Sequence, residues 1–332
     1  MPCSIVVGGA FGDEGKGKII SHIALKENPS IAVRGGVGPN AGHTVVKDRK
    51  TLKLRMLPCA VVNEGTKLMI GAGVLVDPQV LLKEIAETGS QNRVTVDVNC
   101  AIIEQRHIEA DRSGYLKEKI GTTGTGTGPA NSDRVLRFGK LARDEELLSD
   151  YIGDVSLEVN ASLDRKEFVL LEGTQGTMLS LYHGVYPFVT SKDVSASAVC
   201  SDVGIGPKRV DQVIVVFKSY LTRVGSGPLV NELDPDETVR RGWQEYGSVT
   251  GRLRRAAPFD YELARRSITL NSGTQIALTK LDTLFPGCAG VRDYTKLPRE
   301  AREFVANVES ELGRPVVYIG TGNEAEDVID RT

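Results

Sequence analysis

Short apolar runs rich in β-branched residues recur along the chain and predict strands. Seven runs stand out: Ser4–Val7, Ile31–Val33, Leu68–Ile70, Phe168–Leu171, Val213–Phe217, Gln275–Leu278 and Val316–Ile319. Their apolar residues are continuous rather than alternating, which is typical of a parallel sheet that is covered on both faces.

Helix patterns lie between these runs. Asp77 as the N-cap and Pro78 in the first turn begin one helix, and Gly89 stops it. Another pattern ends before Gly313 and consists of Ala301, Phe304, Val305, Val308 and Leu312. A further helix is predicted from Leu147, Leu148, Tyr151, Ile152 and Val155.

The alternation of strands and helices predicts an α/β fold with a central, mainly parallel sheet flanked by helices and long functional loops. No linker, repeat or low-complexity segment interrupts the pattern. We therefore expect a single domain over residues 1–332.

The charge balance and the cysteine and histidine positions exclude several classes of protein. The 332 residues hold 41 Lys and Arg against 43 Asp and Glu, which argues against a general binder of nucleic acid or anionic membranes. The five cysteines form no C-x-x-C pair and the four histidines have no zinc-like spacing, so we expect reduced thiols and no structural zinc. No apolar run approaches a membrane span, and the N-terminus is unlike a signal peptide. A cytoplasmic protein is expected.

Glycine is in surplus, with 36 residues, and its clusters mark the candidate sites. The strongest cluster is GDEGKGK at Gly12–Lys18, between a predicted strand and a predicted helix. Exposed backbone N–H groups, a helix N-terminus and lysines suit a phosphate-binding loop. Ile19 stands where a magnesium-binding Ser or Thr would follow, so Asp13 is the candidate metal ligand. A glycine-rich turn with solvated charges is the alternative.

Two further glycine loops carry polar side chains. His43 lies among small residues in the loop Arg34–Thr44, where it would serve as an acid or hydrogen-bond donor beside a phosphoryl group. Gly121–Pro129 alternates Gly and Thr and offers N–H and O–H donors with little bulk. A structural loop histidine and a flexible linker are the open alternatives.

Two charged motifs complete the candidate set. Lys280 and Asp282 follow a predicted strand, where a carboxylate accepts the two N–H donors of guanine and an adenine ring would leave it unpaired. Tyr246–Arg255 carries three arginines behind glycine turns, which suits carboxylate or phosphate binding. Ordinary solvated surface charges are the alternative for both motifs.

Together these motifs resemble the adenylosuccinate synthetase family in its short, archaeal-type form, over essentially the whole chain. The matching segments, in order, are Gly12–Lys18, Asn40–Thr44, Gly121–Ala130, Glu172–Ser191, Thr222–Pro228, Thr250–Arg255 and Lys280–Asp282. The resemblance implies a P-loop-like nucleotide-binding fold and a ligase that joins IMP and L-aspartate with GTP hydrolysis.

The resemblance also implies the chemistry. Asp13 and His43 would be catalytic: Asp13 would take the N1 proton of IMP, and His43 would stabilise charge between GTP and the 6-oxygen. The γ-phosphoryl group would move to that oxygen, and the aspartate amine would displace it from 6-phosphoryl-IMP. Asp13 and the Gly42 carbonyl would hold Mg²⁺.

Binding residues follow from the same resemblance. GTP would contact Gly12, Asp13, Glu14, Gly15, Lys16, Gly17, Lys18, Gly42, His43, Thr44, Arg254, Lys280, Leu281, Asp282, Gly320, Thr321 and Gly322. IMP would contact Asn40, Ala41, Thr123, Arg137, Gln175, Thr190, Val224 and Arg252. Aspartate would contact Ser248, Val249, Thr250, Gly251, Arg252 and Arg254. Arg137 would reach IMP from the neighbouring subunit of a homodimer.

The chain departs from the family pattern at Phe11, Thr125, Val249 and Gly320, none of which removes a group that the reaction needs. Two other functions stay open: a phage-type 2-aminoadenylosuccinate synthetase acting on dGMP, and a non-catalytic GTP-binding regulator. Retention of Asp13 and Arg252 favours IMP over dGMP. A regulator would need neither a base nor substrate arginines.

Overall fold

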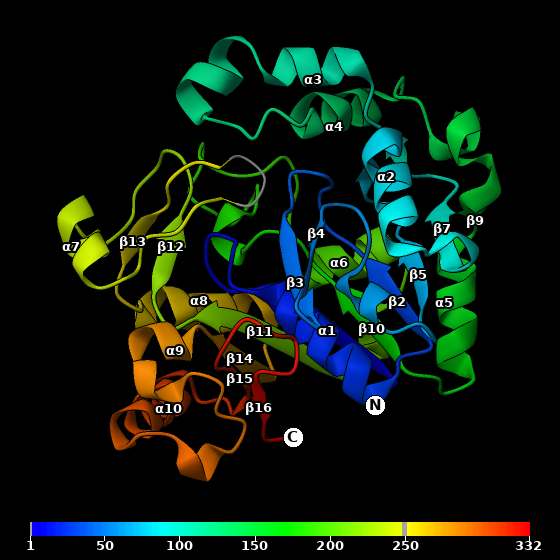
Figure 1. Ribbon diagram of the computed structural model, residues 1–332. Helices are drawn as coiled ribbons and strands as arrows, with labels where there is room; N and C mark the ends of the chain where they lie inside the picture. Colours follow the sequence, from blue (N-terminus) through cyan, green and yellow to red (C-terminus); the bar gives the residue numbers. More distant parts are fainter. Residues whose placement is uncertain (1, 248–250) are drawn as a thin grey trace.

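A mainly parallel sheet of ten strands forms the centre of the computed structural model, which describes residues 2–247 and 251–332 (Figure 1). The strands are β1 (Cys3–Gly8), β2 (Ile31–Arg34), β3 (His43–Lys47), β4 (Lys50–Leu54), β5 (Lys67–Ile70), β6 (Leu75–Val76), β7 (Val94–Asp97), β8 (Ala101–Ile102), β9 (Ile152–Gly153), β10 (Val169–Glu172), β11 (Gln212–Lys218), β12 (Leu221–Arg223), β13 (Arg255–Ala257), β14 (Gln275–Thr279), β15 (Val316–Gly320) and β16 (Val328–Asp330). The order in the sheet is β16-β15-β14-β11-β1-β10-β2-β5-β7-β9, and only β16 runs antiparallel to its neighbour.

All seven predicted strands are confirmed, as β1, β2, β5, β10, β11, β14 and β15, and they form one unbroken block of the sheet. The strands that the pattern missed lie at the sheet edges or in three separate strand pairs: β3-β4, β12-β13 and β6-β8. These strands lack the continuous apolar run because most of them are short or partly exposed.

Helices cover both faces of the sheet. They are α1 (Lys16–Glu27), α2 (Pro78–Thr88), α3 (Gln105–Asp111), α4 (Thr127–Leu136), α5 (Val155–Asp164), α6 (Ala196–Val203), α7 (Pro235–Arg240), α8 (Tyr261–Asn271), α9 (Leu281–Leu284) and α10 (Arg299–Leu312). On β1, Ile5 and Val7 belong to the core cluster that includes residues of α5, α6, α8 and α10, whereas Val6 belongs to the cluster that includes residues of α1 and α2. Burial on both sides explains the continuous apolar runs.

Two helix predictions are confirmed and one is wrong. Asp77 caps α2 by accepting hydrogen bonds from Gln79 N and Val80 N, and Gly89 and Gly313 end α2 and α10 in the left-handed conformation. The predicted helix through Leu147–Val155 is instead a 3-10 segment (Glu146–Tyr151), then β9, then α5. Gly153 pairs with β7, and the Asp154 side chain caps a new helix by accepting from Leu157 N, so one apolar pattern spans three elements.

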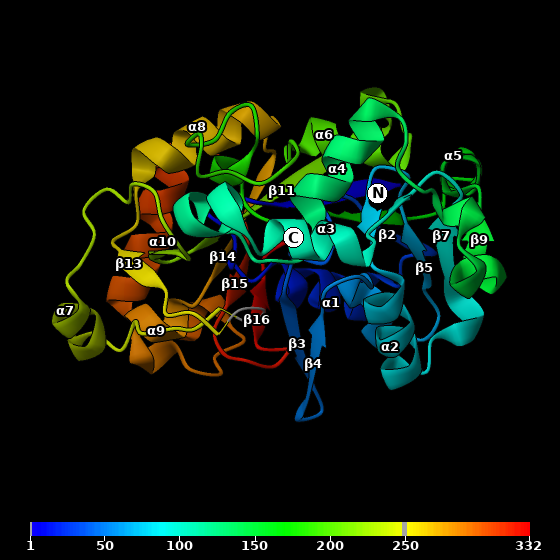
Figure 2. The same cartoon turned by 90° about the horizontal axis from the view of Figure 1, so that it is seen from above.

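The loops that carry the motifs meet at one edge of the sheet. β1, β2, β10, β11 and β14 are parallel neighbours, so their carboxyl ends lie together. In open α/β sheets this edge is where ligands bind, at the point where the strand order reverses. Figure 1 shows α3 and α4 apart from the helices that cover the sheet, and Figure 2 shows them across the middle of the molecule.

None of the helices within the described ranges combines the length and apolar character needed to cross a membrane.

A partly buried ion pair ties the loop after β2 to helix α6. Asp202 Oδ1 lies 2.6 Å from Lys192 Nζ, and Asp202 Oδ2 accepts a hydrogen bond from Gly36 N at 2.8 Å. Lys192 Nζ also donates to the carbonyls of Gly36 and Gly73. A Cβ atom at Gly73 would lie 1.9 Å from Asp202 Oδ1, so the pair leaves no room for a side chain there.

We predict that Gly73→Ala lowers the free energy of unfolding by about 1–3 kcal/mol, because the added methyl group must push the buried Asp202 carboxylate away from Lys192. Gly206→Ala is the matched control, since Gly206 has an ordinary φ of −71° and open space around it. The control is expected to be neutral or slightly stabilising. Denaturant unfolding of the two variants compares them, and equal stability would contradict the close packing at Gly73.

Candidate active site

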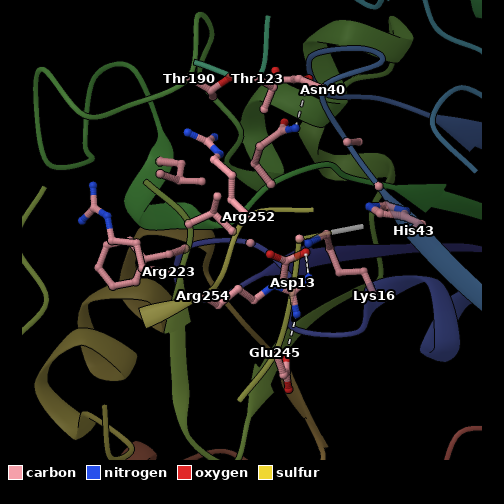
Figure 3. A pocket seen from close by; sticks show the side chains of 18 of the residues that line it. Asp13, Lys16, Asn40, His43, Thr123, Thr190, Arg223, Glu245, Arg252 and Arg254 are labelled. Carbon is pink, nitrogen blue, oxygen red and sulfur yellow. Dashed lines mark hydrogen bonds and ion pairs between the residues drawn. The ribbon is translucent and has the colours of Figure 1, made fainter. Parts of the chain in front are cut away.

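A cavity of about 1150 Å³ opens at the carboxyl edge of the sheet and receives side chains from every predicted motif (Figure 3). The predicted residues that line it are Gly12, Asp13, Gly15, Lys16, Gly17, Lys18, Asn40, Ala41, Gly42, His43, Thr44, Thr123, Gln175, Thr190, Val224, Arg252, Arg254, Lys280 and Gly322. Segments more than 300 residues apart in the chain thus form one wall.

An internal ion pair shapes the loop after β1. Glu14 Oε1 accepts hydrogen bonds from Ala10 N at 3.0 Å and Gly12 N at 2.8 Å, and Glu14 Oε2 lies 2.9 Å from Lys16 Nζ. Both charged side chains are only 2% exposed. The Glu14 carboxylate is therefore turned into the loop, and only its backbone is left for a ligand.

Asp13 lies at the tip of this loop in a left-handed conformation, with φ of 62°, which is uncommon for a residue with a side chain. Its Oδ1 atom lies 2.7 Å from Arg254 Nη2 (Figure 3). Burial raises the pKa of Asp13 above its ordinary value, although Arg254 and Lys218 oppose the rise. A carboxylate with a raised pKa is a stronger base than a solvated one.

Glu245 holds Arg254 from the other side. Its carboxylate pairs with Arg254 and with Lys218 Nζ at 2.8 Å, and it accepts a hydrogen bond of 2.5 Å from the Tyr220 hydroxyl. Burial alone would raise the pKa of Glu245, but Lys218 and Arg254 lower it to about 2. Glu245 is thus an anion that fixes Arg254 beside Asp13.

His43 begins β3 and presents one edge of its ring to the cavity (Figure 3). Its Nδ1 atom lies 2.7 Å from Arg34 Nη1 and 2.5 Å from Glu172 Oε1, both of which are buried. Burial, and then the Arg34 cation, lower the pKa of His43 to about 4. The ring is therefore neutral near pH 7 in the absence of a ligand.

Three residues predicted to hold IMP are joined by hydrogen bonds. Gln175 Nε2 donates to Asn40 Oδ1 at 3.1 Å, and Asn40 Nδ2 donates to Thr190 Oγ1 at 3.1 Å. Arg252 Nη1 donates to the Gly121 carbonyl at 2.8 Å, which joins the arginine motif to the Gly-Thr loop. That loop leads into α4, which begins at Thr127 directly after Gly126, whose left-handed conformation forms the N-cap.

The residues predicted to hold guanine are only partly in the cavity. Lys280, in a left-handed conformation, and Gly322 line it, whereas Asp282 does not; its Oδ1 atom is buried and has no hydrogen-bond partner among the described residues. The side chains of Leu281 and Thr321 are buried in the protein, and Gly320 packs against Lys18. Lys18 Nζ donates to the Glu324 carbonyl, and burial lowers the pKa of Lys18 to about 8.

A few predicted residues lie elsewhere. Arg137 is exposed at the C-terminal end of α4 and does not line the cavity of its own chain. Gly251 is exposed and also does not line the cavity. Ser248, Val249 and Thr250 lie outside the described residues.

Sequence reasoning missed several residues of the site. Glu245 carries no motif of its own, although it stands directly before the arginine segment that it holds. Arg223 lines the cavity and places its guanidinium carbon 4.4 Å from the centre of the Phe11 ring. Arg34 ends the predicted strand β2, but its partner Glu172 is 138 residues away in the chain and becomes its neighbour only in the folded sheet.

This arrangement suits phosphoryl transfer between two bound nucleotides. One wall offers the glycine-rich loop and helix α1 for phosphates, and the facing wall offers amides, hydroxyls and arginines. A carboxylate with a raised pKa and a neutral imidazole lie between them. Catalysis of phosphoryl transfer depends mainly on such positioning and electrostatic stabilisation.

Comparison with known proteins gives a consistent result. The sequence model of the family described as Adenylosuccinate synthetase matches residues 5–144 and 138–287. Curated relatives with that name include those of Thermococcus onnurineus, at 54% identity over 100% of this chain and 99% of the relative, and Methanocaldococcus jannaschii, at 55% identity over 99% and 97%.

Two solved structures share the fold. The fully ligated adenylosuccinate synthetase of Plasmodium falciparum has a TM-score of 0.90 and 28% identity, covering 99% of both chains. The succinoaminodeoxyadenylate synthetase of cyanophage S-2L, bound to dGMP and dATP, has a TM-score of 0.83 and 26% identity, covering 99% of this chain and 95% of the phage protein. With its fold, its motifs and its archaeal relatives in agreement over the full length, the chain belongs to the adenylosuccinate synthetase family.

Proposed function

We propose that this cavity joins IMP and L-aspartate with hydrolysis of GTP, giving adenylosuccinate, GDP and phosphate. The product is the first committed intermediate on the way from IMP to AMP. The observation that carries the proposal is the meeting of Asp13, His43, the Asn40–Gln175–Thr190 group and the arginine motif around one cavity. Membership of the family provides the reaction type, and the lining of one cavity by these residues supports their proposed roles.

The first step requires a nucleophilic O6. Loss of the N1 proton of IMP to Asp13 places negative charge on O6, which then attacks the γ-phosphoryl group of GTP. The raised pKa of Asp13 supports its role as the base. His43 faces the same space and stabilises charge on the transferred group.

In the second step the amine of L-aspartate displaces phosphate from C6 of 6-phosphoryl-IMP. Phosphorylation is needed first because a hydroxyl-type oxygen is a poor leaving group. Arg252 and Arg254 line the cavity, and their planar guanidinium groups would bind the carboxylates of aspartate. For Arg254 this requires that its contact with Asp13 opens.

The donor set also fits Mg²⁺. Asp13 and Gly42 both line the cavity, and together with phosphate oxygens they offer the hard oxygen ligands that this ion prefers. Bound there, the ion would neutralise charge on the β- and γ-phosphates. Ile19 packs in the core and offers no oxygen, which leaves Asp13 as the loop's side-chain ligand.

The two alternatives are less well supported. The phage enzyme is 26% identical, whereas the archaeal relatives named adenylosuccinate synthetase are 54–55% identical. A GTP-binding regulator would not need a carboxylate of raised pKa beside Arg254.

The assembly and compartment are part of the same proposal. Val135, Leu136 and Phe138 flank Arg137 and are 67%, 62% and 61% exposed, which supports burial of this patch in a homodimer that carries Arg137 to the partner's IMP site. All five cysteines are free thiols and buried, in keeping with the cytoplasm. One sheet holds strands from both ends of the chain, which supports a single domain over residues 1–332.

A substrate matrix tests the function itself. We predict adenylosuccinate, identified by mass spectrometry, only when IMP, GTP and L-aspartate are all present. ATP should support a much lower rate, because Asp282, whose Oδ1 has no hydrogen-bond partner in the described part of the chain, would accept donors that adenine lacks. Equal rates with ATP would contradict the role of Asp282, and preferential turnover of dGMP would favour the phage-type activity.

Asp13→Asn tests the base. We predict a fall in kcat of at least about 10³-fold with an unchanged fold, because the amide can neither take the N1 proton nor bind the metal as an anion. Asp48→Asn is the matched control: Asp48 is also left-handed, with φ of 51°, but is exposed on the β3–β4 turn and outside the cavity. Near-normal turnover by Asp13→Asn, measured by the same product assay, would show that Asp13 is not the base that takes the N1 proton.

Subunit mixing tests Arg137. Arg137→Ala and Asp13→Asn should each be almost inactive alone. After unfolding and refolding together in equal amounts, they should recover about a quarter of the wild-type rate, because half the dimers are mixed and each mixed dimer has one intact site. No recovery, with mixed dimers verified by mass spectrometry, would place Arg137 outside the partner's site.

A further inference from the structure

A buried ion pair lies directly behind His43. Arg34 ends β2 and Glu172 ends β10, and the two residues are register partners across the parallel strands. Their side chains are 1% and 0% exposed, and the Arg34 Nη1 atom is in contact with Glu172 Oε1. Neither residue lines the cavity, so neither would touch a substrate directly.

The carboxylate of Glu172 is held on every side. Oε1 faces Arg34 Nη1 and His43 Nδ1, and Oε2 accepts a hydrogen bond of 2.7 Å from the Cys59 amide. Arg34 is fixed in turn because its Nη2 donates to the Leu57 carbonyl at 3.1 Å. The group therefore has one position, set by two strands of the central sheet and the segment after β4.

Two contacts of His43 Nδ1 bear on where the ring proton lies: Glu172 Oε1 at 2.5 Å would accept a proton from Nδ1, and Arg34 Nη1 at 2.7 Å would donate one to it. The Glu172 contact is the shorter of the two. Arg34, His43 and the Cys59 amide together lower the pKa of Glu172 to about 2, against the opposing effect of burial, so the carboxylate is ionised. An ionised oxygen 2.5 Å from a bare nitrogen lone pair would be repelled. A proton on Nδ1 turns the same contact into a charge-assisted hydrogen bond.

The other ring nitrogen is then the one that faces the ligands. His43 lines the cavity, and within the described part of the chain Nε2 has no hydrogen-bond partner (Figure 3). Because Nδ1 is fixed from behind, rotation of the ring would break the contact with Glu172. Nε2 is therefore held toward the cavity.

A metal ion is a weaker explanation of the same cluster. Ligand atoms of His43, Cys59 and Glu172 lie within 4.8 Å of one another. The Arg34 guanidinium already occupies the anionic centre, and burial keeps the pKa of the Cys59 thiol well above its ordinary value. A protonated thiol beside a fixed cation is a poor ligand set.

We propose that Glu172 is a positioning residue for the reaction: its carboxylate, held by Arg34 and the Cys59 amide, accepts the Nδ1–H of His43 and aims Nε2 into the cavity. The inference rests on the proposed function of His43, but it assigns a separate role to residues outside the cavity. It resembles in principle the carboxylate that orients the histidine of a catalytic triad.

The first test needs no substrate. In the ¹⁵N-labelled protein with His43→Gln for assignment, NMR of the histidine side chains should show His43 as the Nδ1–H tautomer. An Nε2–H tautomer would overturn the proposal, because Nδ1 would then accept from Arg34 instead. This result is independent of turnover, so failure of the proposed function and failure of this inference are distinguishable.

The second test is kinetic. Glu172→Gln should lower kcat about 10²-fold while KM for IMP and GTP changes less than about threefold, since binding groups are left in place. In the His43→Ala background the same change should cost nothing more, because its effect passes through His43. Two results would overturn the proposal: a further loss of kcat when Glu172→Gln is added to His43→Ala, or a normal kcat for Glu172→Gln alone.

The control is Glu84→Gln. Glu84 is another buried carboxylate, which accepts backbone hydrogen bonds from Arg55, Met56 and Leu57 and does not contact His43. Any effect of this variant on kcat should be the same in both backgrounds.

If Glu172→Gln does not fold, Arg34→Met with Glu172→Leu removes both buried charges together. That folded double variant should lose kcat to the same extent, and wild-type kcat would overturn the proposal.

Discussion

The need to pair charge that is buried at the carboxyl edge of the sheet governs this structure. β2 and β10 end in Arg34 and Glu172, β11 ends in Lys218, and all three residues are almost completely buried. An unpaired charge in such a place costs several kcal/mol. Arg34 and Glu172 meet across the strands, and Lys218 requires Glu245 from a distant loop. These ion pairs fix the positions of the loops, because each buried charge needs a partner of opposite charge.

Beside each ion pair, one reactive group faces the cavity. The Glu14–Lys16 pair stiffens the phosphate loop, and Asp13 stands at its tip. Glu245 holds Arg254 beside Asp13, and the pair behind His43 leaves its Nε2 facing the ligands. The reactive groups are thus positioned by charged neighbours, of which Lys16 and Glu245 also line the cavity, whereas Glu14, Arg34 and Glu172 do not. This division explains how a site built almost entirely on loops has a defined geometry before any ligand binds.

Local sequence signals predicted the centre of the fold and the motifs of the site. Strands buried on both faces leave continuous apolar runs, and Asp77 and Gly313 mark helix ends because capping is local. Edge strands such as β9 and β16 are too short to leave a pattern, and the helix expected at Leu147–Val155 failed because Asp154 starts a new element. Glu245 and Arg34 could not be predicted as site residues, since their partners are brought to them only by the folded sheet. Glu14 lies in the strongest motif, yet only the structure shows its carboxylate turned inward.

The central claim is that one cavity holds both nucleotides, with Asp13 and His43 between them. A crystal structure with IMP, Mg²⁺ and a non-hydrolysable GTP analogue tests it most directly. We expect the purine of IMP beside Asn40 and Gln175, guanine on Lys280 and Asp282, and the Asp13 carboxylate moved from Arg254 to the metal and N1. IMP bound elsewhere, or Asp13 still paired with Arg254 in the full complex, would contradict the account.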